Sequence, residues 1–64
     1  MTVTEIKEAV DSGLTVHWQN AAYKVVKDSK GQYLIECING SYIGLTYKDG
    51  LTLNGDQSEF FIKN

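Results

Sequence analysis

The spacing of apolar positions changes once along the chain, which divides it into a helical and an extended part. Near the N-terminus the apolar residues stand three or four positions apart, at Val3, Ile6, Ala9 and Val10. This spacing places them on one face of a helix. Thr2 and Glu5 have the spacing of a capping box, and Gly13 suits the left-handed end of a helix. We therefore predict a helix over residues 3–12.

After Gly13, apolar and polar residues alternate with a period of two. Five runs rich in β-branched and aromatic residues follow, over residues 14–18, 22–28, 32–38, 41–47 and 58–63. Turn signals such as Asn39-Gly40 and Asp49-Gly50 separate them. The pattern predicts five antiparallel strands in a meander. The link over residues 48–58 is long enough for a single helical or 3₁₀ turn around Leu51-Thr52-Leu53, before the last strand.

The lengths of two loops predict how the central strands pair. A three-residue loop at 29–31 places Lys24 opposite Glu36, which is a favourable pair of charges. The loop near Asn39-Gly40 allows two registers, and a slip of one residue exchanges the faces of a strand. A three-residue loop at 38–40 gathers the apolar side chains on one face, so we favour it, with a glycine bulge.

This register defines an inner and an outer face. The inner face holds Tyr23, Val25, Tyr33, Ile35, Cys37, Ile43, Leu45 and Tyr47. The outer face holds Ala22, Lys24, Val26, Leu34, Glu36, Ile38, Tyr42 and Thr46. The outer face is more apolar than a solvated sheet usually is. We expect something to cover it: the N-terminal helix, a second copy, or a partner.

These elements predict an α+β protein, with an N-terminal helix followed by an SH3-like small β-barrel. Closure into a barrel would remove the exposed strand edges. The alternative is a helix packed on an open five-stranded sheet. The chain has 64 residues, which suits a single domain over 1–64 with a marginal core.

The segment from Trp18 to Phe61 resembles short uncharacterised proteins of bacteriophage and environmental viral genomes. The shared pattern is Trp18-x-Asn20-x-x-Tyr23-x-Val25-x-x-Asp28-x-x-Gly31-Gln32-Tyr33-Leu34-Ile35-x-Cys37, then Ile43-Gly44-Leu45-Thr46-x-x-Asp49-Gly50-x-Thr52-Leu53-Asn54-Gly55, then Phe60-Phe61. The resemblance covers about two-thirds of the chain and implies a phage origin. It implies no mechanism, so no functional residue is carried over.

Composition and charge favour a protein partner over other macromolecules. Six lysines, no arginine and eight acidic residues give a net charge of −2, which lacks the basic footprint of a nucleic-acid-binding protein. Nucleic-acid binding by a small barrel is kept as the alternative function. No stretch approaches a membrane span, and residues 1–10 lack the apolar centre of a signal peptide. We expect a cytoplasmic protein, in the host cytoplasm if it is phage-encoded.

The sequence offers no set of residues for catalysis, a cofactor or a metal. The single histidine, His17, is expected to point outward as a surface or edge residue, and Cys37 to be a buried inert thiol. The acids Asp49, Asp56 and Glu59 lack the spacing of a calcium loop and are interpreted as a solvated turn. We expect neither an enzyme nor a cofactor.

The remaining candidate site is a surface for another protein. Its residues would be Trp18, Val26, Leu34, Ile38 and Tyr42. Amphipathic aromatic rings and aliphatic side chains dominate the centres of protein interfaces. The sequence therefore predicts a small binding protein that acts on a host protein or on itself, for example as a homodimer.

Overall fold

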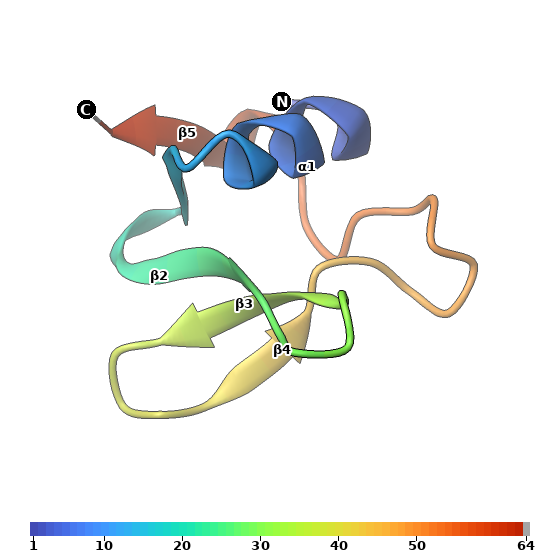
Figure 1. Cartoon of the computed structure of the whole chain (residues 1–64). Coiled ribbons are helices and arrows are strands. Elements are labelled where there is room, and N and C mark those ends of the chain that lie inside the picture. The colour runs from blue at the N-terminus through green and yellow to red at the C-terminus, as the bar shows by residue number, and fades with distance from the viewer. Residues whose placement is uncertain (64) are drawn as a thin grey trace.

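A computed structural model describes residues 1–63 and combines one helix with a five-stranded antiparallel sheet. The elements are α1 (Val3–Asp11), β1 (Thr15–Trp18), β2 (Asn20–Lys27), β3 (Tyr33–Cys37), β4 (Tyr42–Gly44), the 3₁₀ turn η1 (Gln57–Glu59) and β5 (Phe60–Lys63). The strands lie in the order β4-β3-β2-β1-β5. Figure 1 shows α1 and β5 together on one side of the molecule, with β3 and β4 on the other. The predicted α+β class is confirmed.

The helix begins and ends where the sequence predicts, within one residue. The capping box is formed: the Thr2 hydroxyl accepts from the Glu5 amide at 3.1 Å, and Glu5 accepts from the Thr2 amide at 2.8 Å. Gly13 follows the helix with a φ of +85°, in the left-handed region that glycine adopts most readily. Local sequence signals therefore suffice to set both ends of α1.

The predicted strand register is also confirmed. Lys24 lies opposite Glu36, and their charged groups are 3.7 Å apart. Ile35 lies opposite Ile43, because a three-residue loop at 38–40 joins β3 to β4. The loop turns at Gly40, whose φ is +93°. Within β2, β3 and β4 the two faces are therefore assigned as the sequence predicts. Tyr47, predicted on the inner face, lies beyond β4 and is 58% exposed.

The core lies between α1 and the inner face of the sheet. Its buried residues are Ile6, Ala9, Val16, Val25, Ile35, Leu45 and Phe60. Because Ile6 and Ala9 belong to this core, the helix covers the inner face. At its end, Asp11 accepts from the Tyr33 hydroxyl at 2.7 Å and pairs with Lys27 at 3.4 Å. The helix therefore leaves the outer face uncovered.

The sheet is open between its edge strands β4 and β5, so the predicted barrel is not confirmed. The strand predicted over residues 41–47 ends as β4 at Gly44. Beyond it, Thr46 forms an isolated bridge with Leu53, and the Tyr47 amide donates to the Thr52 carbonyl at 2.9 Å. The helical or 3₁₀ turn expected around residues 51–53 does not form there, because Leu53 and Thr52 pair with Thr46 and Tyr47. The 3₁₀ turn forms instead at η1.

Candidate functional site: the outer sheet face

One row of side chains crosses the outer face on all five strands. The row consists of Phe61, His17, Lys24, Glu36 and Tyr42, in the order of β5, β1, β2, β3 and β4. Residues directly opposite one another in antiparallel strands share a face and touch. The row therefore divides into an aromatic end, a pair of charges and a tyrosine.

At the aromatic end, His17 is not the exposed residue that the sequence predicts. It points to the outer face, but only 9% of it is exposed. The Phe61 ring packs on it at 5.5 Å between centroids, and Nδ1 lies 2.9 Å from the Tyr23 carbonyl oxygen. The correction has a physical cause: β5 pairs with β1 and brings Phe61 over the imidazole.

At the centre of the row, Glu36 contacts both Lys24 and Tyr42. Glu36 lies 3.7 Å from the Lys24 ammonium through Oε1 and accepts from the Tyr42 hydroxyl at 2.7 Å through Oε2. Tyr42 is 56% exposed. The hydrogen bond to the Glu36 carboxylate raises the pKa of the Tyr42 phenol above its ordinary value. Both charged side chains remain partly exposed to solvent, so they are available to a partner.

Apolar side chains flank the charged pair on both sides along the strands. On one side, Val26 and Leu34 are directly paired and half-buried. On the other side the Ile38 amide donates to the Ala22 carbonyl, and Ile38 is 85% exposed. A hollow of about 380 Å³ adjoins this second flank, lined by Ala21, Ala22, Lys24, Glu36, Cys37, Ile38 and Gly40. An exposed aliphatic side chain thus stands beside a depression.

The structure separates Trp18 from the other candidate interface residues. Its ring meets Tyr23 edge-on at 5.1 Å and stacks on the buried Phe60 at 6.3 Å. Its Nε1 donates to Glu59 at 3.3 Å. Val26, Leu34, Ile38 and Tyr42 do lie on the outer face. Trp18 packs against the core, so we leave it out of the binding surface.

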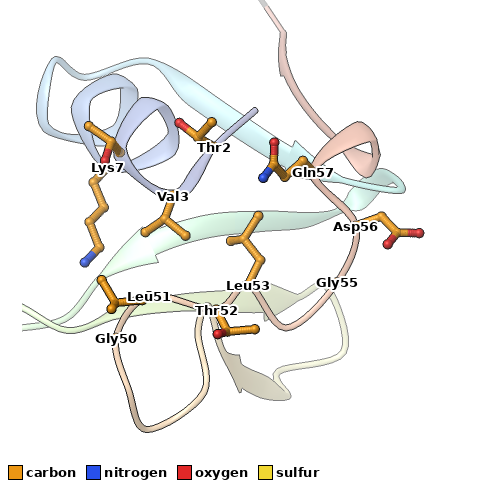
Figure 2. Close-up of a pocket in the computed structure, with 11 residues that line it drawn as sticks. Thr2, Val3, Lys7, Gly50, Leu51, Thr52, Leu53, Gly55, Asp56 and Gln57 are labelled. Atoms are coloured by element: carbon orange, nitrogen blue, oxygen red, sulfur yellow. The ribbon is translucent and has the colours of Figure 1, made fainter.

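A second depression, which the sequence analysis missed, lies beside the start of α1. It has a volume of about 600 Å³ and lies between α1 and the segment 50–57. Figure 2 shows Val3 and Leu53 pointing toward one another across it, whereas the Asp56 carboxylate points away. No periodicity in the sequence places these distant segments together, so no local signal could have revealed this cleft.

The other candidate titratable groups have local structural partners. Asp49 accepts from the amides of Leu51 and Thr52 and from the Thr52 hydroxyl, which together hold the pKa of its carboxyl below the usual range. Cys37 is a half-buried free thiol on the inner side, opposite Tyr23. Among residues 1–63 no three His, Cys, Asp or Glu side chains gather as metal ligands would.

The lysines that could have formed a basic patch are partly neutralised. Lys24 pairs with Glu36, and Lys27 pairs with Asp11 at 3.4 Å. The hydrogen bond to Asp11 raises the pKa of Lys27. Two of the three neighbouring lysines, Lys24 and Lys27, are thus paired with acids. Across the described residues, no helix has the length and apolar character needed to cross a membrane.

No family model, curated protein or solved structure matches this chain. The resemblance to phage proteins therefore stays a prediction. What supports a function is the geometry of the outer face.

Proposed function

We propose that the chain is a non-catalytic binding protein whose outer sheet face contacts another protein. The contact surface consists of Val26, Leu34, Ile38 and Tyr42, which surround the Lys24–Glu36 pair. The observation that carries the proposal is the position of α1, which packs on the inner face only. It leaves apolar and tyrosine side chains together on the other face.

The composition of this surface suits protein recognition. Interface centres favour aromatic and aliphatic side chains, with a few polar groups that fix the orientation of the partner. Tyr42 supplies an exposed ring, Ile38 an exposed aliphatic side chain, and Lys24 with Glu36 an oriented pair of charges. A phage origin and a cytoplasmic location belong to the same proposal.

We further propose that the architecture is SH3-like, with the barrel left open at one side. The strand order β4-β3-β2-β1-β5 and the 3₁₀ turn directly before β5 support this assignment. In such an arrangement the outer face of β2, β3 and β4 is presented to solvent, and the helix is an addition that seals the core.

Site-specific photo-crosslinking in cells that produce the chain tests the proposed function. A benzophenone amino acid replaces Tyr42 on the outer face, and in a matched control it replaces Leu51, which is 79% exposed outside that face. We expect adducts with protein from position 42 and few from position 51. Equal adducts from both positions, or none from position 42, would contradict the proposal.

A further inference from the structure

We propose that the outer face binds a second copy of this chain, through a two-fold axis that runs parallel to the strands between β2 and β3. This inference rests on the proposed function, because it names the partner of the same surface. It follows from the placement of charges, a protruding side chain and a hollow on that face.

The Lys24–Glu36 pair selects this axis over the other simple arrangement. Two sheets that pack face to face with two-fold symmetry can have the axis along the strands or across them. An axis across the strands, along the Lys24–Glu36 row, places Lys24 over Lys24 of the second copy and Glu36 over Glu36. An axis along the strands places each lysine over a glutamate, so that four charges alternate in sign. Like charges that face one another across an interface are strongly unfavourable, so the charges favour the second arrangement.

The same axis brings the exposed isoleucine to the hollow. Ile38 stands beside β3 and Ala22 on β2, at the same level of the sheet. The two-fold rotation therefore places Ile38 of each copy over Ala22 of the other. Ala22 lines the 380 Å³ hollow, and its small side chain leaves room for an aliphatic one. The contact is made twice, once in each direction.

The remaining rows of the face match in the same way. Val26 lies over Leu34 of the second copy, which buries the remaining exposed parts of two aliphatic side chains against each other. Tyr42 on β4 lies near His17 on β1, in the row that holds the charges. The two apolar rows thus meet apolar rows of the second copy. The charged row meets the charged row with lysine and glutamate exchanged.

The size of the face makes this dimer weak and reversible. Four strands about 4.8 Å apart and five residues long give a face of roughly 300 Å² in each copy. Two copies would bury roughly 600 Å², below the ~1,200 Å² of stable complexes. The exposed area of one copy, 4217 Å², is close to the ~4,100 Å² expected of a compact monomer of its mass. We therefore expect a monomer in dilute solution and a dimer at high concentration.

Sedimentation equilibrium of three proteins tests the arrangement: the natural chain, Lys24→Glu and Glu36→Lys. For the natural chain, we expect the mass to rise from 7.1 kDa toward twice that value between about 0.1 and 2 mM. Each charge reversal alone creates like-charge contacts and should weaken association by about tenfold or more. Both positions are partly exposed, and circular dichroism checks that both variants remain folded.

The decisive sample is an equal mixture of the two variants. Lys24→Glu carries two acids at the centre of its face, and Glu36→Lys carries two lysines. If the faces meet as proposed, the mixture associates at least as strongly as the natural chain, although neither variant associates alone. The control is Lys30→Glu, a reversal outside the outer face, which should leave association unchanged.

Two results would overturn the inference. One is a natural chain that remains at 7.1 kDa throughout, and the other is a mixture that stays monomeric. The crosslinking experiment then separates the two proposals. Adducts from position 42 with a different protein would leave the proposed function standing and remove only the second copy. No adducts at all would remove both.

Discussion

Leu34 and Ile35 are neighbours on β3 and lie in opposite environments. Ile35 is fully buried under α1 and packs with Val25 and Ile6. Leu34 is half-buried on the outer face, where it is paired with Val26. The comparison teaches that the one helix within residues 1–63 covers the inner face, while apolar side chains also lie on the outer face. The inner face forms the core, and the outer face stays partly exposed.

Truncating each of these neighbours should give the largest difference between the faces. We expect Ile35→Ala to lower the free energy of unfolding by about 3–4 kcal/mol, because it leaves a cavity in a core of only seven buried hydrophobic residues. We expect Leu34→Ala to cost less, about 1–2 kcal/mol, since Leu34 is only partly buried. Urea unfolding measures both.

The milder change Ile35→Val keeps this comparison measurable if Ile35→Ala does not fold, and it should cost about 1 kcal/mol. Equal losses for Leu34→Ala and Ile35→Ala would show that the outer face is part of the core.

The contact between Trp18 and the turn before η1 should give the next largest effect. A Cβ atom added at Gly55 would lie 2.7 Å from the Trp18 Nε1. Gly55→Ala must therefore displace the indole that donates to Glu59, and we expect a loss of about 2–3 kcal/mol. The matched control is Gly50→Ala, which also has a positive φ but meets nothing within 4 Å and should cost about 1 kcal/mol. Equal melting temperatures for the two variants would contradict this account.

The local features of the fold could be predicted from the sequence, and those that depend on distant segments could not. The ends of α1 and the register of β2, β3 and β4 follow from caps, glycine turns and alternation. The burial of His17 depends on Phe61, and the position of Trp18 depends on Glu59, which is 41 residues away. The alternation correctly places Val26, Leu34 and Tyr42 on one face. It could not show that α1 leaves that face open.

The contacts of Asp11 at the end of α1 with Tyr33 and Lys27 on the sheet should have a smaller effect on stability, and this effect depends on pH. The Tyr33 hydrogen bond, with Lys27 nearby, lowers the pKa of Asp11 below 3.8. The stabilisation from Asp11 is therefore present above pH 3.8 and is lost as the pH falls through the lowered pKa. Lys27 has a raised pKa, so its contribution is present below pH 10.5 and is lost as the pH rises through the raised value.

An NMR titration of the Asp11 carboxyl measures its pKa and so tests these contacts. In Tyr33→Phe we expect the pKa of Asp11 to move back toward 3.8, with little change in stability because the site is exposed. An unchanged pKa would show that the hydrogen bond does not form in solution.

The hydrogen bond between Tyr42 and Glu36 on the outer face should have the smallest effect on stability. The Glu36 carboxylate raises the pKa of the Tyr42 phenol above 10.0, so Glu36→Gln should return that pKa to its ordinary range. Ultraviolet titration of tyrosine absorbance in the variant and the natural chain measures the change. A matched Asp28→Asn variant should leave Tyr42 unaffected. A Tyr42 pKa that is equal in the natural chain and in Glu36→Gln would show that the two side chains do not meet.

The most direct test of the central claim is the access of solvent to methyl groups on the two faces. A dissolved paramagnetic chelate broadens the NMR signals of methyl groups that solvent can reach. In dilute protein we expect the methyl signals of Leu34 and Val26 to broaden, and those of Ile35 and Val25 to stay sharp beneath α1. Equal protection of Leu34 and Ile35 would show that the outer face is covered within a single chain, and would contradict its assignment as a binding surface.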